Sequence, residues 1–124
     1  MLEVALVFDT QGNTLHWQDG SSGVYIPDSH DLWTILWENR DTLGGVAHTH
    51  PWSGDAWPSQ EDVTTWNAVE RGLGKRLVWP IVTFTAVRYF VWCAEKNRYI
   101  GGDQIPIEID IEGLRARSSR PGIV

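Results

Sequence analysis

The sequence predicts an α/β fold in which a mixed β-sheet has helices packed on it. Short runs rich in β-branched and aromatic residues recur along the chain, and clusters of turn-forming residues separate them. Two other segments repeat apolar residues at intervals of three and four, which is typical of helices. The resulting order of elements, βββ-α-β-α-βββ, favours one mixed sheet carrying two helices.

Length, charge and cysteine content narrow the class of protein. At 124 residues the chain has room for one domain, predicted over residues 1–112, followed by a loosely ordered tail over 113–124. The net charge of -6 argues against binding to nucleic acid or to an anionic membrane surface. Cys93 is the only cysteine, which fits a reducing compartment, and no run approaches the roughly 20 apolar residues of a membrane span. The predicted location is the cytoplasm.

The first part of the chain is expected to form an antiparallel meander and then a helix. Strands are predicted at residues 4–8, 14–17 and 24–26, with Gly- and Asn-containing turns between them. The helix would begin at Asp28 or Ser29 as the N-cap and carry one apolar face for about three turns.

The centre of the chain predicts a strand, a loop and a second helix. Gly45-Val46-Ala47 leads as an apolar strand into two histidines, and Pro51 ends it. Residues 51–58 contain too much Pro and Gly for regular structure. The second helix is predicted to run from Ser59 to about Arg71.

The last part of the chain reads as further strands. Residues 77–82 and 83–93 are rich in Val, Ile, Phe, Tyr and Trp, although Pro80 predicts that the first lies at an edge or contains a bulge. A short strand is predicted at residues 98–100. The strict alternation of Ile with Pro and acidic residues over 105–111 predicts a half-buried strand.

Two histidines and an aspartate are spaced as metal ligands would be. His48 and His50 are two residues apart on the predicted strand, so their side chains point to the same side. Asp62 falls in the first turn of the second helix. These are three ligands for a divalent metal with a fourth position open, as a catalytic zinc requires. Ser59 and Asp62 also fit a capping box, in which the serine is the N-cap.

These motifs resemble those of the JAMM metalloproteases, also called the MPN-plus or JAB family. The family motif is a glutamate, then His-Ser/Thr-His-Pro, about seven residues, and Ser-x-x-Asp. This chain has His48-Thr49-His50-Pro51, then residues 52–58, then Ser59-Gln60-Glu61-Asp62. The resemblance implies a JAB/MPN-like fold, a layered architecture similar to that of cytidine deaminases, in which helices sandwich a mixed sheet.

The resemblance also implies roles for individual residues. His48, His50 and Asp62 would bind Zn²⁺, and Ser59 would donate a hydrogen bond to the oxyanion of the tetrahedral intermediate. A carboxylate must act as the general base. Glu3, which lies 45 residues before His48 and precedes an apolar strand, fits that position, and Glu38 is the alternative.

The implied function is that of a zinc-dependent metallopeptidase or isopeptidase. Its substrate would be a protein or peptide, cut at the C-terminal tail of a ubiquitin-like or sulfur-carrier protein. Trp52 and Trp57, in the loop between the ligands, either pack over the site or form an apolar wall that grips an extended peptide. The alternative function is a catalytically weak or inactive scaffold or peptide-binding module that keeps the zinc site. Oligomers are compatible with the tryptophan content.

Overall fold

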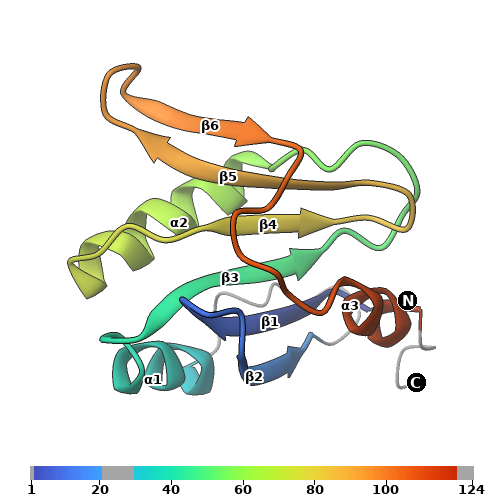
Figure 1. Cartoon of the computed structure of the whole chain (residues 1–124), viewed down its shortest axis with the longest axis horizontal. Helices are drawn as coiled ribbons and strands as arrows, with labels where there is room; N and C mark the ends of the chain where they lie inside the picture. The colour runs from blue at the N-terminus through green and yellow to red at the C-terminus, as the bar shows by residue number, and fades with distance from the viewer. Residues whose placement is uncertain (1, 21–29, 120–124) are drawn as a thin grey trace.

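The protein is built on one six-stranded mixed sheet. The structure, a computed structural model of the whole chain, describes residues 2–20 and 30–119. The strands within these ranges are β1 (Val4–Asp9), β2 (Thr14–Asp19), β3 (Leu43–Thr49), β4 (Trp79–Val82), β5 (Val87–Cys93) and β6 (Arg98–Gly102). The helices are α1 (His30–Glu38), α2 (Gln60–Leu73) and α3 (Ile111–Ser118), and Figure 1 shows the arrangement. The expected α/β class with a mixed sheet is confirmed, whereas the strand predicted at 24–26 lies outside the described residues.

The strand order across the sheet is β2-β1-β3-β4-β5-β6. Only β3 and β4 pair in parallel, and the other neighbours are antiparallel. The connection between the two parallel strands contains α2, as parallel pairing requires a crossover of this kind. The end of β3 and the start of α2 therefore meet at the same edge of the sheet.

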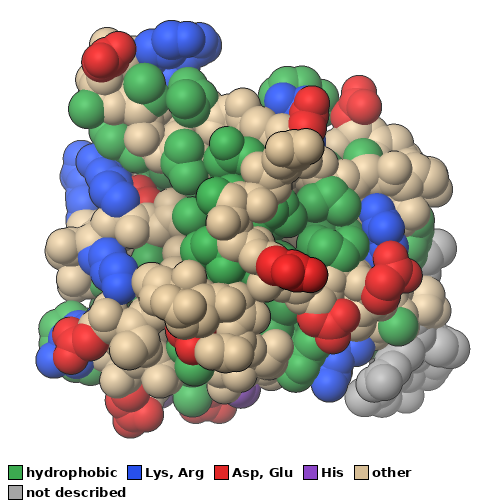
Figure 2. Space-filling model, viewed as in Figure 1, with side chains coloured by type: hydrophobic (Ala, Val, Ile, Leu, Met, Phe, Trp, Pro, Cys, Tyr) green, Lys and Arg blue, Asp and Glu red, His purple; other side chains and the backbone are tan. Residues whose placement is uncertain are grey.

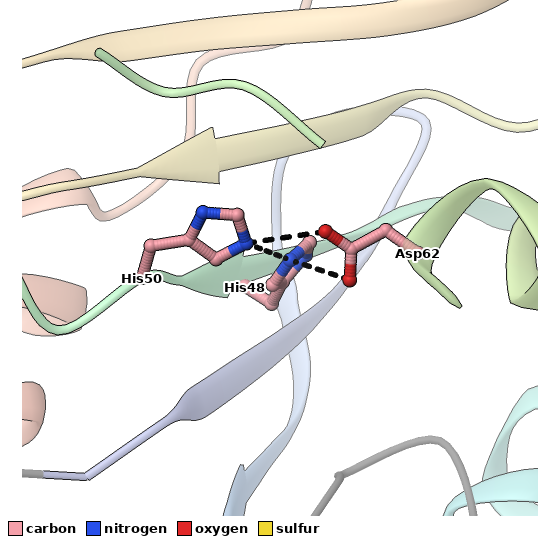
Figure 3. A group of neighbouring side chains, drawn as sticks. All are labelled: His48, His50 and Asp62. Atoms are coloured by element: carbon pink, nitrogen blue, oxygen red, sulfur yellow. Dashed lines mark hydrogen bonds and ion pairs between the residues drawn. The ribbon is translucent and has the colours of Figure 1, made fainter. Parts of the chain in front are cut away.

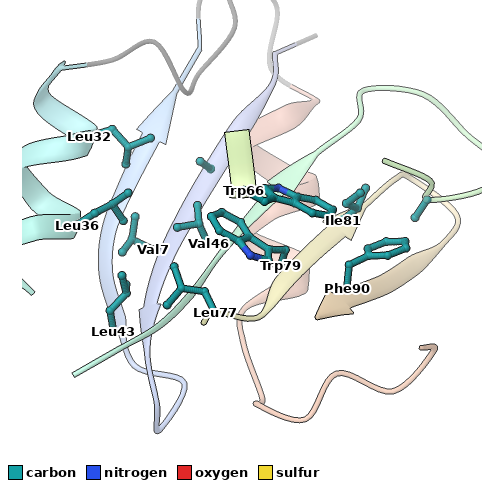
Figure 4. Packing of buried hydrophobic residues seen from close by; sticks show 12 residues of the cluster. Val7, Leu32, Leu36, Leu43, Val46, Trp66, Leu77, Trp79, Ile81 and Phe90 are labelled. Atoms are coloured by element: carbon teal, nitrogen blue, oxygen red, sulfur yellow. The ribbon is translucent and has the colours of Figure 1, made fainter. Parts of the chain in front are cut away.

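Both faces of the sheet are covered, by different elements. Alternate side chains of β1 point to opposite faces, so that Ala5 and Val7 join one apolar cluster and Leu6 and Phe8 join another. Helices α1 and α2 pack on the first face, through residues such as Leu36 (Figure 4). Helix α3 and the chain that leads to it pack on the second face. Figure 2 shows that face, with hydrophobic side chains gathered across its middle and charged ones mostly toward its margin.

The strand predicted over 105–111 is not present. Residues 103–110 cross the second face of the sheet without forming a strand, and α3 begins at Ile111 (Figure 1). Ile107 and Ile109 nevertheless pack on the core while Glu108 is exposed. The alternation correctly predicts that every second side chain is partly buried. The prediction of a strand is wrong because burial of alternate residues needs no hydrogen-bonded partner strand.

One glycine allows this crossing segment to lie against the β1–β2 turn. Gly12 has a φ of 86°, a conformation that residues with a side chain rarely adopt. A Cβ at this position would also lie only 2.0 Å from the carbonyl oxygen of Glu108. Close approach of the segment to the turn therefore depends on glycine.

The prediction of a loosely ordered C-terminal tail is wrong for the residues up to Ser119. They form α3 and the turn that ends it, with Leu114 fully buried in the second cluster. The Ser118 hydroxyl donates a hydrogen bond of 2.6 Å to the carbonyl of Leu2. The apolar pattern of this segment is too weak to predict a helix, because only Leu114 and Ile111 pack on the cluster and hydrogen bonds of Ser118 complete the contact. Residues 120–124 lie outside the described part of the chain.

Strand β4 lies inside the sheet, although Pro80 predicts an edge or a bulge. Its parallel pairing with β3 joins Gly45 to Val78 and then His48 to Ile81, so the ladder is interrupted around the proline. Pairing with β5 on the other side continues through Pro80 itself. A proline lacks only the N–H donor, so one interrupted contact on one side is enough to accommodate it.

None of the helices in residues 2–20 and 30–119 has the length and apolar character needed to cross a membrane.

Because Leu114 carries much of the packing of α3, its truncation tests whether the helix belongs to the folded core. Leu114→Ala is expected to lower the free energy of unfolding by about 2–5 kcal/mol, through lost apolar burial and the cavity left behind. Urea unfolding followed by circular dichroism measures this. The control is Glu112→Ala on the exposed side of the same helix, expected to change stability by less than about 0.5 kcal/mol. Equal stability of the two variants would show that α3 does not contribute to the core.

Candidate metal centre

The three predicted ligands come together where β3 ends and α2 begins. His48 lies in β3 and His50 directly follows it. The N–H of His50 donates to the carbonyl of Val82 at 2.9 Å, which continues the pairing with β4 beyond the last strand residue. Alternation along this extended segment directs both imidazoles to the face covered by α2. Asp62, in the first turn of α2, faces them.

The capping box and the ligand position coincide in Asp62. The Ser59 side chain accepts from the Asp62 N–H at 3.0 Å, and Asp62 Oδ2 accepts from the Ser59 N–H at 2.9 Å. The same carboxylate also faces both histidines. The two interpretations of the Ser-x-x-Asp spacing are therefore compatible, because fixing the first turn of the helix also orients the carboxylate.

The three side chains form a tight buried cluster (Figure 3). Nε2 of His48 is 3.0 Å from Nε2 of His50. Nε2 of His50 is 3.1 Å from Asp62 Oδ2, and Nε2 of His48 is 3.3 Å from Asp62 Oδ1. The side chains of His48, His50 and Asp62 are only 10%, 8% and 4% exposed. One potential ligand atom from each lies within 4.8 Å of the others.

These distances suit a shared metal ion. Ligand atoms around a tetrahedral ion with bonds of about 2.0–2.1 Å lie roughly 3.3 Å apart, close to the spacings found. If both facing Nε2 atoms of His48 and His50 carried protons, two N–H groups would point at each other over 3.0 Å. A cation between the nitrogens and the carboxylate removes that conflict. The His48, His50 and Asp62 cluster can therefore hold a metal ion.

Aromatic rings fix the two imidazoles from outside the cluster. The buried Trp66 ring meets His48 edge-on with centroids 6.5 Å apart, and the exposed Trp52 ring lies 4.5 Å from His50. Nδ1 of His50 is buried and has no hydrogen-bond partner in the described part of the chain. Packing on Trp52 and the contacts of Nε2 therefore set the orientation of His50, without a second hydrogen bond to its ring.

The loop between the ligands is fixed to the turn that follows β4. Gly54 donates its N–H to the Thr85 hydroxyl at 2.8 Å and accepts from the Thr83 hydroxyl at 2.7 Å. Ala56 is completely buried in the first apolar cluster. The predicted irregular loop over 51–58 is confirmed, and these contacts hold the start of α2 against the end of the sheet.

Glu3 lies beside the cluster because of the register of β1. Ala5 is the cross-strand partner of His48, and Glu3, two residues earlier, falls on the same face. The Glu3 carbonyl accepts from the N–H of Gly20 at 2.8 Å, which extends the pairing with β2. Glu3, His48 and Asp62 line one cavity of about 50 Å³. The structure thus brings the predicted base carboxylate to the predicted ligands.

The two carboxyl groups of this site differ in their pKa. Burial disfavours ionised Asp62, but hydrogen bonds from His48 and His50 outweigh it and hold its pKa well below the usual range. Burial likewise raises the pKa of Glu3, and attraction to His48 offsets this only in part. Asp62 is therefore suited to remain an ionised ligand, whereas Glu3 is suited to accept a proton.

Hydrogen bonds on both sides hold the backbone around Glu3. Leu2 donates its N–H to the carbonyl of Ser118 at 2.9 Å and accepts from the Ser118 hydroxyl. Val4 donates its N–H to the Thr49 hydroxyl at 2.9 Å. Glu3 is thus not at a frayed end of the chain. Neither contributor can be predicted from the sequence: Thr49 stands out only as the residue between two histidines, and no local pattern marks Ser118.

The remaining candidates occupy different positions. Ser59 is exposed at the N-cap of α2, next in the helix turn to Asp62. Glu38, the alternative base, is exposed at the end of α1 and does not line the cavity that contains Glu3. The placement thus favours Glu3 over Glu38 as the carboxylate of the site.

Comparison with known proteins does not assign the chain to a family. No family model matches the chain, and a search of curated proteins finds no significant match.

The cluster predicts metal binding by the purified protein. Wild-type protein offered zinc and then passed through a desalting column should retain about one ion per chain. His48→Ala and Asp62→Ala should each lose it, because two ligands rarely hold such an ion. Elemental analysis by mass spectrometry gives the stoichiometry. Asp55→Asn, an exposed acid in the adjoining loop, is the control and should retain the ion. Wild-type protein without metal, or retention by both ligand variants, would contradict the assignment.

The Thr49 contact can be tested by a substitution of the same shape. Thr49→Val leaves the buried Val4 N–H without an acceptor and is expected to lower the free energy of unfolding by about 1–3 kcal/mol. Thr49→Ser keeps the hydroxyl, and its free energy of unfolding should fall clearly less than that of Thr49→Val. Urea unfolding measures both, and elemental analysis should find the metal content unchanged. A serine variant as unstable as the valine variant would show that the methyl group, not the hydrogen bond, stabilises this contact.

Proposed function

We propose that this chain is a zinc-dependent peptidase or isopeptidase of the JAMM type. The observation that carries the proposal is the buried cluster of His48, His50 and Asp62 with Glu3 beside it. A scaffold has no physical need for three convergent ligands and an adjacent carboxylate with a raised pKa. Such a combination is typical of metal-assisted hydrolysis.

The donor set favours zinc over harder cations. Two imidazole nitrogens and one carboxylate oxygen suit zinc, while calcium and magnesium prefer oxygen ligands alone. Zinc in such a site would supply a Lewis acid that polarises the carbonyl of the scissile bond. Three protein ligands leave room for substrate at a fourth position.

Glu3 would be the proton carrier of the reaction. Glu3 is half-buried and lines the cavity that His48 and Asp62 also line. Burial raises the pKa of this carboxyl group, which makes it a stronger base than an exposed glutamate. It would take the proton of the attacking water and deliver it to the leaving amine.

Ser59 would stabilise negative charge on the carbonyl oxygen. Its oxygen accepts from the Asp62 N–H, which fixes the side chain at the helix N-cap and leaves the hydroxyl hydrogen available for donation. A preorganised donor of this kind contributes on the order of 100-fold or more in rate. The exposed position of Ser59 gives substrate access to it.

The substrate class follows from the chemistry and from the family resemblance. We take the fold to be of the JAB/MPN type, and the substrate to be the C-terminal tail of a cytoplasmic ubiquitin-like or sulfur-carrier protein. Trp52 and Trp57 are both exposed in the loop between the ligands, and the Trp52 ring packs on His50. Exposed aromatic side chains beside a metal suit contact with an extended peptide.

Replacement of Glu3 separates metal binding from catalysis. Glu3→Gln is expected to keep about one zinc ion but to lower hydrolysis at least about 100-fold, because the amide cannot accept the proton. The assay uses ubiquitin-like proteins carrying a peptide extension on the C-terminal tail, with products identified by mass spectrometry. Glu38→Gln is the control and should retain wild-type rates.

Two results would count against this assignment. Cleavage by Glu3→Gln at the wild-type rate would assign the proton transfer to another group. Zinc binding by wild-type protein without cleavage of any such substrate would favour the alternative of a non-catalytic peptide-binding module.

A further inference from the structure

A groove lies between the start of α2 and the β5–β6 hairpin, and Val63, the residue after Asp62, lines it. Its volume of about 550 Å³ is within the range of about 300–1,000 Å³ that is usual for ligand sites. Trp57 and Pro58 form one side, and Phe90 and Tyr99 belong to the other. The next residue after Pro58 is Ser59, so the groove adjoins the proposed oxyanion donor directly.

The groove is basic, although the protein as a whole is acidic. The chain has 10 Lys and Arg against 16 Asp and Glu, yet Arg88, Lys96 and Arg98 all line this groove. No acidic side chain is among the described residues that line it. Lys96 and Arg98 are exposed, and neither forms an ion pair with another described residue. The positive charge is therefore concentrated locally and left largely uncompensated.

One of these cations is held in place. The Arg88 guanidinium lies 4.5 Å from the centre of the Trp57 ring, and its Nη1 is 2.9 Å from Asp103 Oδ1. The Asp103 side chain is 80% exposed, so this ion pair is weak; Arg88 Nε is buried, and a ligand carboxylate can bind the terminal N–H groups of the guanidinium. A preorganised cation loses less side-chain entropy when it binds a ligand.

Gly101 makes room for this arrangement. A Cβ at this position would lie 3.3 Å from Arg88 Nη2 and 2.8 Å from Cε1 of Phe90. Its φ requires no glycine, because it is not among the residues with positive φ. The absence of a side chain therefore leaves space for the guanidinium and the Phe90 ring at the floor of the groove.

We propose that this groove binds an acidic, extended segment of the polypeptide substrate and leads the chain past Ser59 to the metal centre. The identification of that ligand as a substrate rests on the proposed function. Carboxylates complement the three cations, while the Trp57, Phe90 and Tyr99 rings offer apolar contact to an extended chain. Nucleic acid is a poorer candidate, since tight binding to it relies on many phosphate contacts and only Arg88, Lys96 and Arg98 supply cations here.

The test is a binding measurement on metal-free protein, so that it does not depend on hydrolysis. The probes are two short fluorescein-labelled peptides, one of alternating Gly and Glu and the other of alternating Gly and Lys. Fluorescence anisotropy at low ionic strength should show the Glu peptide binding at least about fivefold more tightly, and added salt should weaken it. Equal binding of both peptides, or none of the Glu peptide, overturns the proposal.

A pair of variants places the binding site. Arg98→Glu and Arg71→Glu change the net charge equally, but Arg71 lies in the last turn of α2 and does not line the groove. Arg98→Glu should weaken binding of the Glu peptide about fivefold, and Arg71→Glu less than about twofold. Equal losses would show a general charge effect and overturn the groove assignment. Thermal unfolding checks that both variants are folded.

The experiments can distinguish failure of the groove proposal from failure of the proposed peptidase function. Groove-dependent binding by a protein that cleaves nothing would support the groove and contradict the proposed peptidase. Cleavage that is indifferent to acidic residues and to Arg98→Glu would contradict the groove and leave the peptidase intact.

Discussion

The antiparallel pairing of β1 with β3 determines where the groups of the metal centre lie. It sets Ala5 opposite His48, and the period of two along both strands then places Glu3 on the face of the ligands. A shift of one residue would turn Glu3 to the face covered by α3. The apolar residues of β1, which are buried on both faces, prevent such a shift because it would exchange the two clusters. The same strand register therefore both packs the core and places the Glu3 carboxylate on the face of the ligands.

The start of α2 adds the second constraint. Asp62 is the N3 residue of the capping box and also the carboxylate that both imidazoles face. Burial of a carboxylate destabilises the folded state unless its oxygens accept hydrogen bonds. Here the Ser59 N–H and the two histidines are the partners of the Asp62 oxygens. A helix that begins one residue later would lose its cap and its ligand together. A bound cation would further stabilise the folded state, since the unfolded chain does not assemble these ligands.

The fold class and the metal cluster could be predicted from the sequence because both depend on short-range patterns. The His-x-His spacing on an apolar strand and the serine cap before Asp62 are local signals, and the structure brings the three residues together. The errors concern long-range contacts. The alternating isoleucines over 105–111 indicate which side chains are buried, but not whether the segment pairs with another strand. Pro80 fits inside the sheet because β4 continues to pair with β5 at the proline, and only the pairing with β3 is interrupted. No local pattern connects a C-terminal helix with the first strand.

That unpredicted contact bears directly on the site. At Glu3 the strand ladder continues only on the β2 side, through the Gly20 N–H, because the pairs with β3 begin at Ala5. Ser118 of α3 bonds both backbone groups of Leu2, while Thr49 holds the N–H of Val4 from the opposite face of β3. The residue between the two histidines therefore does not point toward the ligand cluster; its hydroxyl holds the neighbouring strand. The proton transfer proposed for Glu3 requires a carboxylate whose position is maintained to within a fraction of an ångström, and α3 and Thr49 hold the backbone on both sides of it.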